Sequence, residues 1–153
     1  MGELVKVAVD AMGGDFAPAE PVKGAVDAVN ENDGIFVYLV GKEDVLKAEL
    51  SRYTYPADRI QTVPASEVIE TGEPPVKAIR SKKDSSIVVA MNMIRHGEAD
   101  AIVSSGSTGA ILVGGQVIVG RLKGVERPPL APLIPTEKGA SLLIDCGANV
   151  DAR

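Results

Sequence analysis

Two kinds of hydrophobic pattern alternate along the chain. Short, continuous apolar runs rich in β-branched residues are typical of parallel strands that are buried on both faces. They predict strands at residues 5–9, 35–40, 60–63, 101–104 and 142–145. Between these runs, apolar residues recur every three or four positions, which predicts helices. We expect helices over residues 22–29, begun by Pro18 and Pro21, and over residues 43–50, 76–83, 85–96 and 110–122.

The order of these elements predicts an α/β fold with a mostly parallel sheet and helices on both of its faces. Apolar residues make up 45% of the chain, aromatic residues make up 3%, and Trp is absent, so the core must consist of Val, Ile, Leu and Ala. Residues 128–135 are expected to be irregular and partly extended. Because a strand-to-turn unit at residues 145–151 should lead into a further helix, we expect residues 1–153 to be the amino-terminal part of one α/β domain, incomplete at its C-terminus.

The distribution of charge limits the classes of partner. The net charge of -5 disfavours nucleic acid, whose phosphates repel an acidic surface, and few aromatic side chains are available to stack on unpaired bases. The charge is uneven, at -8 over residues 1–76 and +3 over residues 77–153. A locally basic region of this kind can steer an anion toward the protein.

Other features bear on the location of the protein. The single cysteine, Cys146, excludes an internal disulfide and fits a reducing compartment. No basic region followed by an apolar stretch and a cleavage site begins the chain, and its apolar runs fall short of the roughly 20 residues of a membrane span. We therefore expect a soluble, cytoplasmic protein. No cluster of metal-ligating residues is visible, so we expect neither a metal nor a cofactor.

Three turns rich in small residues follow predicted strands, at residues 10–15, 104–109 and 145–149. In open α/β sheets, ligands bind beyond the carboxyl ends of the strands, where such turns lead into helices. The functional residues are therefore expected in these three turns.

The first turn places a pair of glycines between two aspartates. Gly13 and Gly14 would let backbone N–H groups come close to a ligand, and Asp10 and Asp15 could hold water, a hydroxyl group or a metal. The alternative is a tight turn whose aspartate side chains cap the next helix.

The second turn, residues 104–109, reads Ser-Ser-Gly-Ser-Thr-Gly. Hydroxyl and N–H groups at the start of a helix are the usual requirements of an anion site, which favours phosphate binding here. The turn is not a P-loop, because no Gly-Lys-Ser/Thr follows, and its glycine spacing differs from the dinucleotide fingerprint. The alternative is that Ser or Thr caps the next helix.

The remaining chemically capable residues have plainer interpretations. Cys146 has no histidine base nearby in the sequence and is interpreted as a small buried hydrophobic residue. His96, next to Gly97, is expected to hydrogen-bond free carbonyl groups at a helix end. The basic stretch Lys77, Arg80, Lys82 and Lys83 either receives phosphate or an acidic protein, or forms a solvated helix face.

Taken together, several segments resemble the phosphate acyltransferase family of bacterial phospholipid synthesis. They keep the order and spacing of the family over the whole chain and comprise residues 7–15, 82–86, 104–110, 120–124, 127–128, 145 and 147–151. Members are roughly twice this long, so the resemblance identifies an amino-terminal half. The chain departs from the family at Ser105 and Ser107, which replace Ala and Asn, and at Cys146, where Val is common.

The resemblance implies a long-chain acyl transfer from acyl carrier protein to inorganic phosphate, giving acyl-phosphate for phospholipid synthesis. It also implies a fold similar to phosphotransacetylases and isocitrate dehydrogenase-like enzymes, a homodimer, and peripheral membrane contact through regions outside this chain. The alternatives are a phosphotransacetylase that uses acyl-CoA and a non-catalytic phosphate-binding fragment.

This chemistry needs neither a catalytic triad nor a covalent cysteine, because a thioester is already activated and phosphate is itself the nucleophile. The turn at residues 104–109 is the expected cradle for phosphate and the oxyanion. The candidate catalytic residues are Asp10, Asp15, Ser107 and Thr108. The candidate phosphate- or substrate-binding residues are Gly13, Gly14, Ser104, Ser105, Gly106, Gly109 and Asn149. The candidates for charge steering or carrier-protein contact are Lys77, Arg80, Lys82, Lys83 and Arg127.

Overall fold

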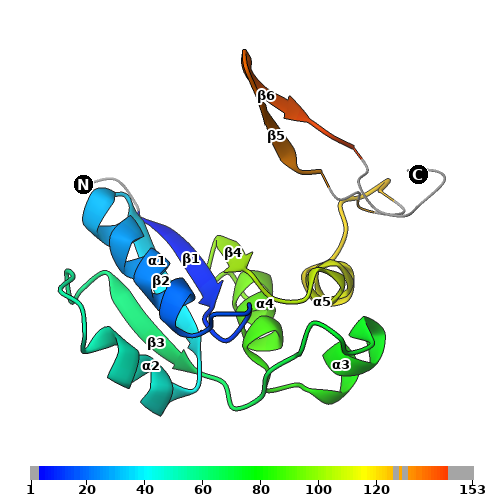
Figure 1. Cartoon of the computed structure of the whole chain (residues 1–153). Helices are drawn as coiled ribbons and strands as arrows, with labels where there is room; N and C mark the ends of the chain where they lie inside the picture. The colour runs from blue at the N-terminus through cyan, green and yellow to red at the C-terminus, as the bar shows by residue number, and fades with distance from the viewer. Residues whose placement is uncertain (1–3, 126–127, 129–130, 145–153) are drawn as a thin grey trace. The chain divides into compact units, whose positions relative to one another are not determined.

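A computed structural model describes residues 4–125, 128 and 131–144 (Figure 1). Its main feature is a sheet of four parallel strands in the order β3-β2-β1-β4. The strands are β1 (Val5–Asp10), β2 (Ile35–Gly41), β3 (Ile60–Pro64) and β4 (Ala101–Ser104). The predicted parallel sheet is thus confirmed, with the first strand in its interior and β4 at one edge.

Helices cover both faces of this sheet, as predicted. On one face, α1 (Ala19–Glu31) packs on β1 and β2, and α2 (Glu43–Leu50) packs on β2 and β3. On the other face, α4 (Ser86–Arg95) packs on β1, β2 and β4. Each of these helices lies between two parallel strands in the chain, so each returns the chain to the edge at which the next strand begins.

The two faces of β2 show why a continuous apolar run is required. Val37 and Leu39 belong to the core under α1 and α2, whereas Val40 belongs to the core under α4, with Tyr38 packed against it. Successive side chains of a strand point to opposite faces, so both residue parities must be apolar when helices cover both sides.

A third apolar cluster lies away from the sheet's centre. It joins α4 to α3 (Pro75–Ser81) and α5 (Thr108–Gly114), with Ile79, Met91 and Ala110 buried in it. A π-helical turn, η1 (Gly115–Val119), continues α5. The helix predicted at residues 110–122 therefore starts earlier, changes its hydrogen bonding at Gly115 and ends at Val119. A Cβ atom at Gly114 would overlap the Sδ atom of Met91, so α4 and α5 pack closely at this glycine.

The chain divides into two compact units, residues 1–119 and residues 120–153. In the second unit, β5 (Leu133–Thr136) and β6 (Gly139–Leu142) pair antiparallel. The strand predicted at residues 142–145 is therefore wrong in its bounds, and so is the irregular segment predicted up to residue 135. A tight turn with Gly139 at φ 136° lets these two short apolar runs pair locally. That the whole chain belongs to one domain stays a prediction.

In the part of the chain that the structure describes, no helix is long and apolar enough to cross a membrane.

Candidate functional site

Two of the three predicted turns lie side by side. β1 and β4 are neighbours in the sheet, and Asp10 stands opposite Ser104 in their register. The turns at residues 10–15 and 104–109 therefore leave the sheet together at its carboxyl edge, where ligands of open α/β sheets bind. The third turn, at residues 145–149, lies outside the described residues, and so do Asn149, Arg127 and Cys146.

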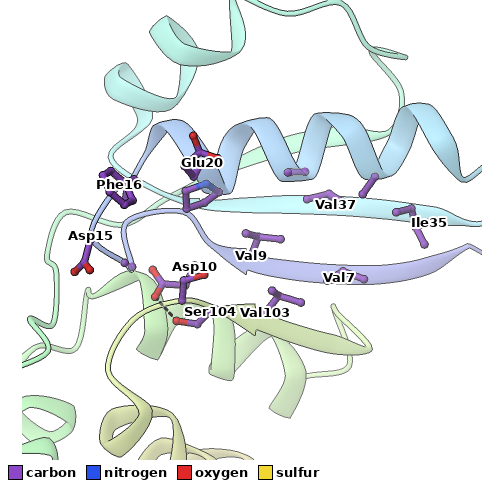
Figure 2. Close-up of a pocket in the computed structure, with 18 residues that line it drawn as sticks. Val7, Val9, Asp10, Asp15, Phe16, Glu20, Ile35, Val37, Val103 and Ser104 are labelled. Atoms are coloured by element: carbon purple, nitrogen blue, oxygen red, sulfur yellow. Dashed lines mark hydrogen bonds between the residues drawn. The ribbon is translucent and has the colours of Figure 1, made fainter. Parts of the chain in front are cut away.

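A buried carboxylate joins the two turns (Figure 2). The hydroxyl group of Ser104 donates a hydrogen bond of 2.7 Å to Oδ2 of Asp10, which is only 1% exposed. The same Ser104 oxygen accepts a hydrogen bond of 3.0 Å from the Gly106 N–H, and Oδ1 of Asp10 accepts one of 3.3 Å from the Met12 N–H. Asp10 thus holds the backbone of both turns, so this arrangement makes it a positioning residue.

The glycines of the two turns face each other. A Cβ atom on Gly13 would overlap Asp10 Oδ2 and would lie 2.9 Å from the backbone nitrogen of Gly106. A Cβ atom on Gly106 would lie 3.2 Å from the Cα atom of Gly13. Side chains at either position would push the turns apart. The glycines are therefore needed for contact between the two turns. The sequence had suggested a different role for Gly13, which was to let a backbone N–H group approach a ligand.

Three candidate residues beside this contact remain open to solvent. Ser105 and Thr108 are exposed, and their N–H groups donate no hydrogen bond to another described residue. The carboxylate of Asp15 is also exposed and has no hydrogen-bond or ion-pair partner in the described parts of the chain. The structure shows no side-chain cap on α1, so the alternative that an aspartate caps this helix does not hold.

Ser107 has a different environment from its neighbours. It is the N-cap of α5, it is 3% exposed, and its hydroxyl oxygen accepts a 3.3 Å hydrogen bond from the Ala110 N–H. The capping alternative is thus observed at this residue. The next glycine, Gly109, packs against the ring of Pro75, with 2.6 Å between a Cβ atom placed on it and Pro75 Cγ.

A cavity of about 580 Å³ opens at the same edge, within the size range of small-molecule sites. Its polar end is formed by Asp10, Asp15, Ser104 and Ser105. Figure 2 shows Phe16 and Glu20 at this end, while the rest of the cavity runs between α1 and the strands over apolar side chains. These are Val7, Val9, Ile35, Val37 and Val103.

The predicted basic residues divide into two groups. Lys82 is half-buried, and its ammonium group donates hydrogen bonds to the Val68 carbonyl at 2.6 Å and to Glu73 at 2.5 Å. The hydrogen bond from Lys82 lowers the pKa of the Glu73 carboxyl. Lys83 bonds the Ile79 carbonyl at 3.2 Å. Lys77 and Arg80 are exposed on α3, which packs beside α5, so these two are the charges of the stretch that remain available.

One local structure was missed by the sequence analysis. The carboxylate of Asp84 accepts hydrogen bonds from the N–H of Ser66 at 2.9 Å and from its hydroxyl at 2.5 Å, which lowers the pKa of Asp84. The Asp84 N–H in turn donates to Glu67 at 3.0 Å. These bonds fasten the segment after β3 to the start of α4. The run Asp84-Ser85-Ser86 indicates such a turn in the sequence. No local pattern indicates that Asp84 bonds Ser66, which lies 18 residues earlier.

His96 occupies the C-cap of α4, as its position beside Gly97 suggested. Its backbone N–H donates a hydrogen bond of 2.9 Å to the carbonyl oxygen of Asn92. Its imidazole makes no hydrogen bond to another described residue, so the expected capping by the side chain is wrong. Among the described residues, no three His, Cys, Asp or Glu side chains gather where they could hold a metal ion.

Comparison with known proteins gives a consistent result. The family described as fatty acid synthesis protein matches residues 5–153. The phosphate acyltransferases of Clostridium beijerinckii and Clostridium botulinum are each 50% identical over 149 residues, which cover 97% of this chain and 45% of each relative. The chain therefore spans less than half the length of these relatives.

A solved structure shares the fold. The EutD phosphotransacetylase from Staphylococcus aureus superposes with a TM-score of 0.65 and 17% sequence identity, over 97% of this chain and 48% of that one. The expectation of a phosphotransacetylase-like fold is thereby confirmed.

Proposed function

We propose that the protein to which this chain belongs transfers an acyl group to inorganic phosphate. The chain belongs to the fatty acid synthesis protein family, and its relatives are named phosphate acyltransferase. The turns at residues 10–15 and 104–109 form the phosphate end of the site. The observation that carries this proposal is the Asp10–Ser104 hydrogen bond, which fixes two glycine-containing turns against each other at the carboxyl edge of the sheet.

The arrangement suits the chemistry of the reaction. A phosphate oxygen attacks the carbonyl carbon of a thioester, the carbonyl oxygen becomes an oxyanion, and the thiolate leaves with the pair of electrons of the C–S bond and takes up a proton. Preorganised N–H and hydroxyl donors stabilise both the phosphate and the oxyanion. The exposed hydroxyl and N–H groups of Ser105 and Thr108 supply such donors, while Asp10 and Ser107 fix the backbone that carries them.

Asp15 has a separate role in this proposal. Its exposed carboxylate lies at the mouth of the cavity and is free to accept a hydrogen bond from a protonated phosphate, directly or through water. That contact would orient the attacking oxygen and remove its proton.

The acyl donor is proposed to be long-chain acyl carrier protein. Carrier proteins of this kind are acidic, and the exposed Lys77 and Arg80 on α3 give a positive surface beside α5. A phosphotransacetylase that uses acyl-CoA is the second candidate, favoured by the shared fold with the Staphylococcus aureus enzyme. Homodimer formation and membrane contact also belong to this proposal, as properties of the longer protein.

The test is an acyl-phosphate assay on the polypeptide of full family length. We expect phosphate-dependent acyl-phosphate formation from long-chain acyl carrier protein and little from acetyl-CoA. The Thr108→Val variant, which keeps the shape of the side chain but loses its hydroxyl, should raise the KM for phosphate by about 10- to 150-fold, since one hydrogen bond to a charged group is worth about 1.5–3 kcal/mol. An unchanged KM for phosphate in both Thr108→Val and Ser105→Ala would refute the cradle.

A further inference from the structure

The apolar part of the cavity is a groove with one wall missing. Its floor consists of side chains of β1, β2 and β4, and α1 forms the wall on one side. Beyond β4, which is the edge of the described sheet, nothing in the described residues up to residue 119 closes it, and Val103 is 53% exposed. On the opposite face, the same β1 and β4 are covered by α4. On the groove face α1 packs on β1 and β2, so it is the edge strand β4 that is covered on one face of the sheet and open on the other.

Apart from Glu20 at the polar end, the wall formed by α1 carries small residues and a proline. Pro21, Gly24, Ala25 and Ala28 line the groove and follow one another at helical spacing. Gly24 lies inside the helix, where glycine is less favourable than alanine. A Cβ atom at this position would meet no atom within 4 Å, so no contact among the described residues requires a glycine there.

From these features we propose that the groove binds an α-helix with an apolar stripe. This helix is supplied by the same polypeptide, outside residues 1–153. Parallel sheets are buried on both faces by helices, and an edge strand that is open on one face leaves that rule unmet. The relatives have more than twice the length of this chain, so they contain the residues that such a helix needs. Small residues on α1 would let the two helix axes approach to about 8 Å, the short end of helix packing distances.

An acyl chain fits the groove less well. Small-molecule pockets enclose most of the surface of their ligand, and this groove lacks the wall beyond β4 that would enclose an alkyl chain. A helix, at about 10–12 Å in diameter, provides its own outer surface and would cover Val103 as well as the groove.

The direction of the helix follows from the rest of the fold. Helices α1 and α2 each connect neighbouring parallel strands, and α4 precedes β4 at the other edge of the sheet; all three run antiparallel to the strands. A covering helix of the same kind would begin at the carboxyl edge, beside Gly14 and Ser105. It would thereby close the cavity at its polar end, whatever reaction takes place there, so the proposal does not depend on the proposed function.

Thiol labelling tests the occupant. The Val103→Cys variant is made in a Cys146→Ser background, in the polypeptide of full family length and without ligand. The matched control is Gly72→Cys, at an exposed loop position where a Cβ atom would meet no atom within 4 Å. We expect labelling at position 103 to be slower than at position 72 by on the order of 100-fold, because it requires local opening of the packed helix. In the chain of residues 1–153, both positions should react at similar rates.

Two results would overturn the proposal. Fast labelling of the Val103→Cys variant in the longer polypeptide, slowed only by a long-chain acyl ligand, would make the acyl chain the occupant. Fast labelling that no ligand slows would mean that the face stays open.

Thermal stability gives a second, independent measurement. The Gly24→Leu variant should raise the melting temperature of the chain of residues 1–153, since its side chain enters open space and favours the helix. In the longer polypeptide it should lower the melting temperature, and Gly24→Ala should lower it less. An increase of similar size in both polypeptides would contradict a packed helix. Neither measurement uses activity, so each can fail while the acyltransferase assay succeeds, or the reverse.

Discussion

The carboxylate of Asp10 and the hydroxyl group of Ser104 lie 2.7 Å apart, although 94 residues separate them in the sequence. Their hydrogen bond links the ends of two neighbouring parallel strands and, through the Gly106 N–H, continues into the second turn. A carboxylate that is almost completely buried is stable only when such donors surround it. The two residues therefore depend on each other, and the shape of the candidate site depends on both.

Removing the hydroxyl group should destabilise the protein. The Ser104→Ala variant leaves Asp10 without its side-chain donor and the Gly106 N–H without its acceptor. We expect the free energy of unfolding to fall by about 1–3 kcal/mol, the usual cost of an unsatisfied buried polar group. Urea denaturation measures this change. Ser105→Ala, a neighbouring exposed serine, is the control and should be nearly neutral, and equal effects at the two serines would argue against a structural role of the hydrogen bond.

The contact between the turns makes a second prediction. Gly13→Ala should destabilise the protein by more than about 2 kcal/mol, because the new methyl group must displace the backbone of Gly106 or the Asp10 carboxylate. Gly72→Ala meets no atom within 4 Å and should change the free energy of unfolding by less than about 0.5 kcal/mol. Thermal and urea unfolding of both variants give the comparison. A Gly13→Ala variant as stable as Gly72→Ala would show that the turns are not in contact.

Acid should weaken the fold through Glu73 and Asp84. Both carboxyls have their pKa lowered in the folded state, from ordinary values of 4.5 and 3.8, by hydrogen bonds from Lys82 and from Ser66 respectively. A carboxyl group whose pKa is lowered in the folded state stabilises the protein at pH values above its ordinary pKa. This stabilisation is lost as the pH falls through the folded-state pKa. The unfolding free energy should therefore decrease as the pH drops below about 4.5.

Two variants identify the source of this acid sensitivity. Glu73→Gln and Asp84→Asn should each give a shallower dependence of unfolding free energy on pH below 4.5. Ser66→Ala removes the side-chain donor of Asp84 but keeps the backbone donor, so its curve should lie between those of the parent and Asp84→Asn. Parallel curves for the parent and all three variants would contradict the assignment.

The two kinds of basic residue should respond differently to substitution. Lys82→Met removes the donor of Glu73 and of the Val68 carbonyl, so it should lower the melting temperature. Arg80→Glu reverses an exposed charge and should leave the melting temperature nearly unchanged. In the polypeptide of full family length, Arg80→Glu should raise the KM for acyl carrier protein and make it less sensitive to salt. An unaffected KM would remove α3 from the proposed carrier surface.

Much of the fold could be predicted because local patterns determine it. The strand at residues 101–104 and the helix at residues 43–50 have the predicted bounds, since a short β-branched run and a helical repeat flanked by turn residues each define one element. The hairpin of residues 133–142 was not predicted. Its strands are only four residues long, and a run of that length is compatible with several structures until its partner is known.

The candidate site shows a sharper division. The sequence placed functional residues at the ends of strands, and two of these turns lie together because parallel neighbours end at one edge. It did not distinguish Ser107, which is a buried helix cap, from the exposed Ser105 and Thr108, because burial depends on the packing of α3 and α5. Likewise, the ion pair of Lys82 depends on a loop nine residues away, and no local pattern reveals it.

The separation of Asp10 and Ser104 along the chain also affects how the protein folds. β1 is made first, but its site partner follows only after β2, β3 and four helices. Contacts between residues so far apart require closure of a long loop, which slows folding. β1 and β2 can pair without β4, whereas the two turns cannot meet until β4 has joined the edge of the sheet. A newly synthesised chain would therefore have most of its core before it has a site, and a ligand for this site would bind only after the sheet is complete.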